Sequence, residues 1–449
     1  MAAAVTPPSG APAVKKAPSV LQKVGNWWTK SAKNLDLFDE NARDKVKTDP
    51  WFMLGGMAML FWLITIFTGT ILMFFYVPDA QGPIYQSWLS VKSILEGDHG
   101  WIIMQVRHLH KYGADALIIA LTLRVYRMYF RGEFKNYNQL SYMLTILGLI
   151  LSMFSGLTGY LLIWNQRALW ATKVFATFPT FLDNFHEIPS IAALSWMGLP
   201  QLLQATLGKL QIGHITADFM LAGQSIGPAT LTRFYPAHFM LSILTLILVE
   251  SYFARKGKGD KGAGGAGRVP RMNLPWYAAV TFTVMLVAIS IAVPVETGSP
   301  ANPNVTPNPI LSDWYFLGLY QMMKLWKPAT ATLQTLLLPL VAFLVVFLDS
   351  SPERSPWKRP FWTVVGIYGL LSWIGFSVLI CLNIADIKRD PPYVYTVSMI
   401  ILGGGAIWHW LYRAAERRKV KALEAAKVAA TIPASISASI PAMAPTAGD

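Results

Sequence analysis

Eight long apolar runs, separated by polar loops, constrain the fold of this chain more than any other feature. They lie at about 51–76, 101–130, 139–163, 230–253, 274–294, 331–348, 360–383 and 393–412. At about 1.5 Å per helical residue, such a run crosses the roughly 30 Å hydrocarbon core of a bilayer. The pattern therefore predicts an all-α, polytopic membrane protein with eight transmembrane helices.

Composition and charge agree with a membrane protein. Hydrophobic residues make up 53% of the 449 positions and charged residues 14%, with a mean hydropathy of +0.39. A net charge of +14 would suggest a nucleic-acid partner in a soluble protein. Here the Lys and Arg residues gather in loops on one side, as the positive-inside rule describes. We therefore expect no nucleic acid, a bacterial inner membrane, and both termini in the cytoplasm.

The same pattern divides the chain into two halves of four helices each. The predicted segments are a disordered basic tail (1–34), a first four-helix domain (35–255), a Gly- and Lys-rich linker (256–273), a second four-helix domain (274–412) and a disordered cytoplasmic tail (413–449). Two long loops, 165–228 and 295–330, lie on the side opposite the basic loops. Long loops in compact proteins tend to carry function.

Two histidines stand at similar depth in the second and fourth runs. His110 and His238 each lie near the end opposite the basic loops. An intramembrane histidine is costly and suggests function. Two facing imidazoles could hold a haem iron between them, but each could instead bond a neighbouring helix or line a proton path. His108 is about 200° around the helix from His110 and cannot share its iron.

Arginines and glycines near these histidines fit a flat anionic cofactor. Arg107 precedes His110 by one turn and Arg233 precedes His238 by five residues, so both are placed to meet haem propionates. Gly69 in the first run and Gly159 in the third would let a macrocycle, or simply another helix, approach the backbone closely.

Four motifs together resemble cytochrome b of the cytochrome bc and bf complexes. They are Arg107–Ala114 (RHLHKYGA), Gly159–Gln166 (GYLLIWNQ), Ala229–His238 (ATLTRFYPAH) and Ile310–Phe316 (ILSDWYF), the last similar to the family's Pro-Glu-Trp-Tyr motif. The likeness covers about residues 35–350 and, more weakly, the last two helices. It implies a haem b with His110 and His238 as its iron ligands, faced by Gly69 and Gly159.

The resemblance also implies an activity. It describes a subunit, not active alone, of a quinol–cytochrome c reductase-like complex that oxidises quinol on the side away from the basic loops. Asp313 matches the family's proton-accepting glutamate, and Tyr160, Trp164, Trp314 and Tyr315 would shape the quinone pocket. The implied partners are quinol, a Rieske iron–sulfur protein, c-type cytochrome subunits and a second copy in a homodimeric complex.

The chain departs from the family where a second haem b would bind. Arg124 stands fourteen residues after His110, and Tyr252 and Phe253 stand where the other histidine would follow His238. Thr145 replaces a glycine, although Gly55 remains. We therefore predict one haem b, with the second absent or held by unfamiliar ligands.

Two further functions fit parts of this pattern. A structural or assembly paralogue could keep the scaffold and bind haem only for folding. The other is a transporter, but the lack of an inverted repeat in the sequence argues against it. An apparent insertion at 184–214 could dock a partner.

Overall fold

A computed structural model describes most of the chain, in ten segments. They are residues 19–33, 50–81, 85–135, 139–187, 189–192, 195–259, 274–307, 310–325, 328–382 and 392–431. Within them the side chains of residues 32–33, 50, 52, 189–190, 245–259, 392–399 and 428–431 are not described. The described residues form helices and turns, together with one isolated β-bridge between Asn165 and Pro300. The predicted all-α class is confirmed for this part of the chain.

A helix stands at each of the eight predicted runs. These helices are α3 (Leu54–Leu72), α5 (Trp101–Phe130), α6 (Gln139–Leu162), α11 (Pro228–Gly259), α12 (Trp276–Ala292), α14 (Pro328–Leu348), α15 (Pro360–Cys381) and α16 (Pro392–Thr431). By length and composition α3, α6, α14 and α15 can each cross a membrane, and α12 is apolar but shorter. The protein is therefore an integral membrane protein, and the count of eight crossings stays a prediction.

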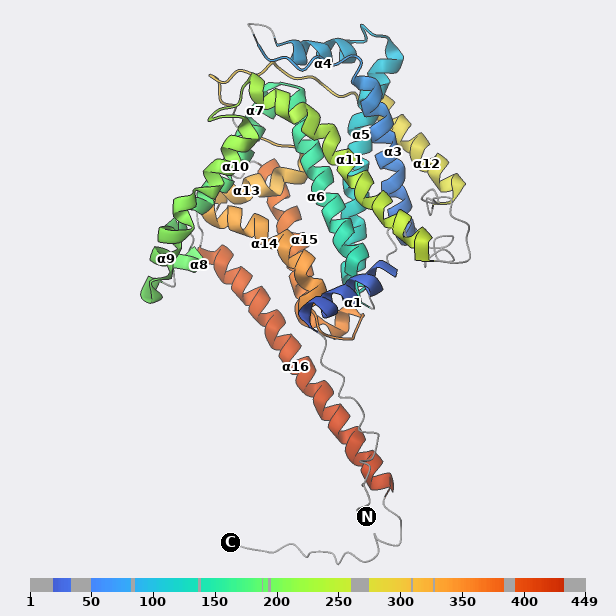
Figure 1. Cartoon of the computed structure of the whole chain (residues 1–449), viewed down its shortest axis with the longest axis vertical. Helices are drawn as coiled ribbons and strands as arrows, with labels where there is room; N and C mark the ends of the chain where they lie inside the picture. The colour runs from blue at the N-terminus through green and yellow to red at the C-terminus, as the bar shows by residue number, and fades with distance from the viewer. Residues whose placement is uncertain are drawn as a thin grey trace, which may run out of the picture.

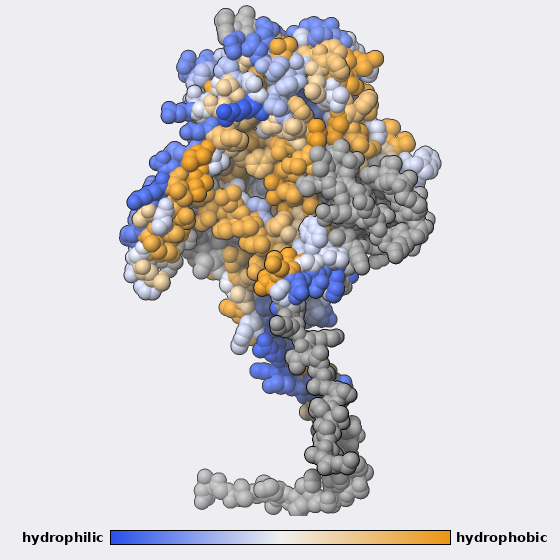
Figure 2. Space-filling view, viewed as in Figure 1, coloured by the Kyte–Doolittle hydropathy of each residue, from blue (hydrophilic) through white to orange (hydrophobic). Residues whose placement is uncertain are grey.

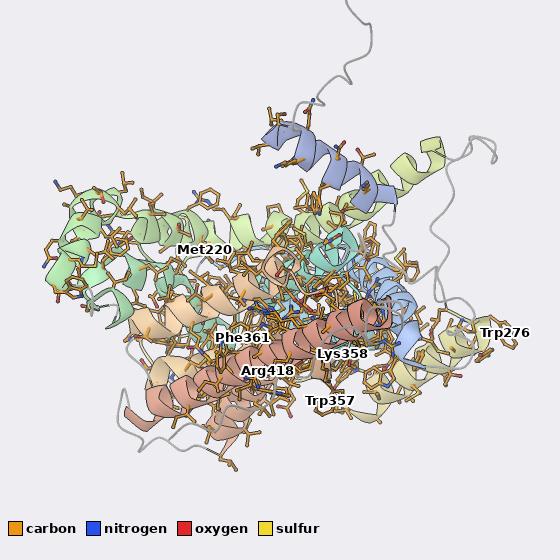
Figure 3. All side chains as sticks on the ribbon, turned by 90° about the horizontal axis from the view of Figure 1, so that it is seen from below. Met220, Trp276, Trp357, Lys358, Phe361 and Arg418 are labelled. Carbon is orange, nitrogen blue, oxygen red and sulfur yellow. The ribbon has the colours of Figure 1, made fainter. Side chains whose placement is uncertain are left out.

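The helices form two adjoining groups (Figure 1). In the first, α5 packs against α3, α6 and α12, and α6 packs against α11. In the second, α15 packs against α16 and against α13 (Leu317–Leu325), which also contacts α14. Seen from below, Met220 and Trp276 lie on opposite sides of the molecule (Figure 3). We call the two ends of the first group the α4 end, after α4 (Gln86–Glu96), and the α1 end, after α1 (Val20–Lys33).

Close packing of α3 on α5 depends on a glycine. A Cβ on Gly113 would lie only 3.1 Å from Cγ2 of Thr65. Without that side chain, the α5 residues Leu117 and Ala120 pack into one buried cluster with Phe61 and Trp62 of α3. The contact fixes how far α5 lies from α3, and therefore where the α5 histidines point.

Both predicted disordered tails contain helix, so those two predictions are wrong in part. Within the first, α1 covers 20–33, where Trp27 packs 5.6 Å from Phe347, ring to ring, and Ser31 is buried. Within the second, α16 continues to Thr431 through a stretch rich in Ala, Glu, Lys and Arg, which are strong helix formers. Similarly, α11 extends to Gly259, past the predicted start of the linker. The rest of both tails and of the linker lies outside the described residues.

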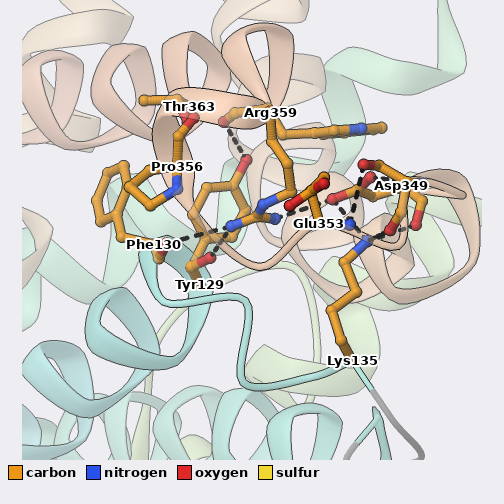
Figure 4. A network of polar contacts seen from close by, with 10 residues as sticks. Tyr129, Phe130, Lys135, Asp349, Glu353, Pro356, Arg359 and Thr363 are labelled. Carbon is orange, nitrogen blue, oxygen red and sulfur yellow. Dashed lines mark hydrogen bonds and ion pairs between the residues drawn. The ribbon is translucent and has the colours of Figure 1, made fainter. Parts of the chain in front are cut away.

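A buried ion network joins the two groups at the α1 end (Figure 4). Arg359 binds the Asp349 carboxylate with Nη1 at 2.9 Å from Oδ2 and donates from Nη2 to the Tyr129 carbonyl at 2.8 Å. Lys135 Nζ lies 2.9 Å from the same Asp349 oxygen and donates to the Ser351 carbonyl at 2.8 Å. One carboxylate between α14 and α15 therefore holds two cations, one of them from the loop after α5.

Candidate functional site

His110 of α5 and His238 of α11 face each other toward the α4 end of the bundle. Their ring centroids lie 6.1 Å apart. Each ring donates from Nδ1 to a backbone carbonyl of a neighbouring helix: His110 to Thr65 at 3.0 Å and His238 to Ser155 at 2.7 Å. These bonds assign the proton to Nδ1 in both rings and leave the Nε2 lone pairs free. That is the form in which histidine binds a metal.

The spacing of the two rings suits a single metal between them. Two imidazole nitrogens on opposite sides of one metal, each about 2 Å from it, place the ring centroids roughly 6 Å apart. The measured separation matches that expectation. Two neutral imidazoles with free Nε2 atoms fit the axial ligation of one haem iron.

Gly69 and Gly159 lie directly against these imidazoles. A Cβ on Gly69 would lie 2.9 Å from Cε1 of His110, and a Cβ on Gly159 would overlap the ring of His238. Any larger residue at either position would displace a ring. The structure therefore brings together four of the predicted haem-site residues, one from each of four helices.

The two predicted propionate arginines behave differently. Arg107 is buried and interacts electrostatically with both imidazoles and with Asp313. Arg233 is exposed, donates from Nη1 to the Phe219 carbonyl at 2.6 Å, and lies over the Phe219 ring. Arg107 therefore interacts with both histidines, whereas Arg233 contacts Phe219 of the segment before α11, and the propionate role of Arg233 stays a prediction.

Asp313 belongs to a charged cluster between its loop and α5. Lys111 Nζ lies 2.9 Å from Asp115 Oδ1 and 3.5 Å from Asp313 Oδ1. Trp314 donates from Nε1 to Asp115 Oδ1 at 3.0 Å, so Asp115 holds the Asp-Trp-Tyr loop against α5. From the other side, Arg167 donates to the Ser312 carbonyl at 2.8 Å.

The sequence reasoning missed Lys111, Asp115 and Arg167. A signal for the first two was present, because Lys111 and Asp115 stand four residues apart inside an apolar run. Such a charge pair is energetically costly in a membrane helix, so its presence suggests a function there. Nothing local marks Arg167, whose carbonyl partner is 145 residues away.

Tyr160 and Tyr315 belong with Trp314 to one hydrophobic cluster, and both interact electrostatically with Asp313. Tyr315 is buried, and its hydroxyl lies so close to Gly156 that a Cβ there would overlap it. The hydroxyl of Tyr160 is buried and finds no hydrogen-bond partner among the described residues. Because an unsatisfied buried hydroxyl costs about 1–3 kcal/mol, this group is a candidate to bond a ligand. Trp164, the remaining predicted pocket residue, packs in a neighbouring cluster.

Toward the α1 end, the matching positions hold no second histidine pair. Arg124 and Thr145 are buried there, and Thr145 donates to the Ser141 carbonyl at 2.8 Å. The side chains of Tyr252 and Phe253 lie outside those that the structure describes.

Comparison with known proteins identifies relatives of both halves. The family described as cytochrome b/b6/petB matches residues 41–198, and the family described as cytochrome b(C-terminal)/b6/petD matches residues 300–401. A cytochrome bc complex cytochrome b subunit from Chlorobaculum thiosulfatiphilum is 25% identical over 339 residues, covering 71% of this chain and 70% of that protein. Cytochrome b from Cereibacter sphaeroides is 25% identical, covering 72% and 76%, and that from Marchantia polymorpha is 27% identical, covering 72% and 77%.

A solved structure shares the fold. A chain of a hyperthermophilic respiratory Complex III superposes with a TM-score of 0.57, covering 81% of this chain and 89% of that one. At 21% sequence identity, this likeness concerns the fold alone.

Proposed function

Because the chain belongs to the cytochrome b family, we propose that it is the quinol-oxidising, haem-b-binding subunit of a quinol:electron-acceptor oxidoreductase complex. Family membership makes it an integral membrane subunit of an electron-transfer complex. The observation that carries the finer proposal is the pair of imidazoles with free Nε2 atoms, His110 and His238. Both interact with the buried Arg107, which also interacts with the carboxylate of Asp313.

In this proposal His110 and His238 hold one haem b. The bound haem supplies a one-electron acceptor and carrier. Gly69 and Gly159 keep the backbone clear beside the ligands, and Arg107 offers a positive charge to carboxylate substituents. Arg124, in the place of a third histidine, is the reason to propose a single haem.

Asp313 acts as the acceptor of a quinol proton. Lys111, 3.5 Å away, holds its carboxylate in place, and Asp115 positions the loop through Trp314. The unpartnered hydroxyl of Tyr160 is available to bond a quinol oxygen, while Tyr315 forms a wall. Two electrons leave each quinol, so a second acceptor is needed. We propose that it is a Rieske protein, in a homodimeric complex that also contains a c-type cytochrome subunit.

The haem count is the first test of this proposal. We expect one haem b per chain, because α5 and α11 supply one histidine pair. A pyridine haemochrome assay on the purified complex, divided by the amount of this polypeptide, measures the ratio. Two b haems per chain would contradict the single-haem proposal, and none would contradict electron transfer by this chain.

The second test removes the proton acceptor. Asp313→Asn should lower quinol oxidation by about a hundredfold or more, since general bases contribute roughly 10²–10⁴-fold, while the haem content stays unchanged. Asp115→Asn keeps the oxygen that accepts from Trp314 but weakens the pairing with Lys111, so we expect a higher KM with a smaller loss of kcat.

Glu96→Gln is the control, because Glu96 is exposed on α4 and pairs with Lys92 four residues earlier. Its turnover should equal that of the unmodified complex. If Asp313→Asn also keeps full turnover, a structural or assembly role for the chain gains support over quinol oxidation.

A further inference from the structure

The segment 179–221, which we call the arm, is a chain of short helices on the flank of the molecule. It consists of η3 (Pro179–Asp183), η4 (Phe185–Glu187), α8 (Pro189–Ala192), η5 (Ser195–Met197), α9 (Leu199–Thr206), η6 (Gly208–Leu210) and α10 (Ile212–Leu221). η3 packs against α14. The arm leaves the end of α7 (Gln166–Thr177), and α8 and α9 lie level with the apolar helix α14 (Figure 1).

The arm carries many exposed apolar side chains. Eight large apolar side chains are each between 46% and 79% exposed: Trp196, Met197, Leu202, Leu207, Leu210, Ile212, Ile215 and Phe219. Surfaces that face water rarely expose so many together. This apolar face continues onto the apolar flank of the neighbouring helices (Figure 2).

The last helix of the arm, α10, is divided lengthwise. Its exposed apolar residues Ile212, Ile215 and Phe219 follow helical spacing and form one stripe, and His214 and Asp218 form a narrow polar stripe beside it. The third side faces inward through Gly213, where a Cβ would overlap the Pro179 carbonyl. A helix with this division suits a membrane interface, with its apolar stripe in lipid and its polar stripe at the headgroups.

Polar groups at the joints of the arm bond one another. The Asp183 carboxylate accepts from the backbone N–H of Gly213 at 2.8 Å and from His214 at 2.9 Å (backbone) and 2.6 Å (Nδ1). Burial alone raises the pKa of Asp183, but these hydrogen bonds outweigh it and lower the pKa, so the carboxylate is charged. Gln204 donates to the Asp183 carbonyl at 3.1 Å and accepts from Phe185 N–H at 3.0 Å.

These bonds satisfy backbone groups at the joints between the short helices. In lipid each unsatisfied backbone group costs several kcal/mol, so irregular backbone must be paired from within. The arm pairs these backbone groups internally and exposes large apolar side chains beside polar ones, which is the polarity that a membrane interface requires.

We propose that the arm is a membrane-interface element, whose apolar face rests in the leaflet next to α7. The arm lies level with α14, and its apolar surface continues onto that of the neighbouring helices, so lipid is favoured over water as its surroundings. The exposed charges Lys209 and Asp218 place it at the interface and not in the hydrocarbon centre. Trp196, the most exposed apolar residue of the arm, suits the headgroup boundary.

The test measures what surrounds Ile215 in the assembled complex. In a Cys381→Ser background, Ile215→Cys is spin-labelled and the complex is placed in lipid nanodiscs. Collision of the label with oxygen, which concentrates in lipid, is compared with collision with a water-soluble nickel chelate. Leu371→Cys on the apolar helix α15 serves as the lipid reference, and Lys92→Cys on α4 serves as the water reference.

We expect the oxygen-to-nickel ratio at Ile215 to match that at Leu371 and to exceed that at Lys92 by at least about threefold. A ratio equal to that at Lys92 would overturn the proposal by showing a water-facing arm. Low collision with both reagents would also overturn it, by showing that another protein covers the surface. If Ile215→Cys prevents assembly, Leu202→Cys on α9 gives the same comparison.

Discussion

His110→Ala or His238→Ala is expected to reduce the b-type haem absorption of the purified complex to below about a tenth of its normal value, because each removes one of the two proposed iron ligands. The two histidines come from different helices, and each is oriented by a carbonyl of a third or fourth helix. No other described histidine faces the pair. The reduced-minus-oxidised spectrum, normalised to the amount of chain, measures the loss.

His108→Ala is the matched control for this prediction. His108 is buried on the same helix, two residues from His110 and therefore about 200° around the helix from it. Its replacement should leave the haem spectrum intact. Full haem content in His110→Ala would show that the iron ligands lie elsewhere and would remove the basis of the proposed function.

Asp349→Ala should destabilise the protein by roughly 3–5 kcal/mol, because it leaves two buried cations without their anion. Arg359 and Lys135 both lie within 2.9 Å of the Asp349 carboxylate. They tie the loop after α5 to the second helix group (Figure 4). The change should appear as a lower unfolding temperature in detergent and a lower yield of folded protein.

Glu353→Ala provides the comparison, because its pair with Lys358 is exposed and contributes little to stability. A further variant replaces Asp349, Lys135 and Arg359 together by Leu, Met and Met. This variant should recover much of the lost stability, since apolar residues can replace a buried ion network at little cost. Equal losses of stability in Asp349→Ala and Glu353→Ala would contradict a stabilising role for the buried ion network.

The helices could be placed from the sequence to within a few residues at most ends. A membrane-length helix needs about twenty apolar residues in succession, and this requirement is local. The same rule failed for α1 and for the end of α16, which are polar or amphipathic helices. In α1, Trp27 finds its partner Phe347 more than three hundred residues away.

The candidate site was only partly predictable for a related reason. His110, His238, Gly69 and Gly159 could be selected from motifs and helical spacing, and the structure brings all four together. The position of Arg233 could not be foreseen, since its partner Phe219 belongs to the arm. The role of Asp115 could not be foreseen either, because it depends on a hydrogen bond from Trp314, 199 residues later in the chain.

The sequence by itself therefore determined the membrane character, the family, the histidine pair and the replacement of a third histidine by Arg124. Each depends on residue type at a given spacing. Only the tertiary structure decided the imidazole tautomers, the positioning of Asp313, the buried ion network around Asp349 and the exposed apolar side chains of the arm. These features depend on contacts between segments far apart in the chain, and such contacts exist only once the helices have packed.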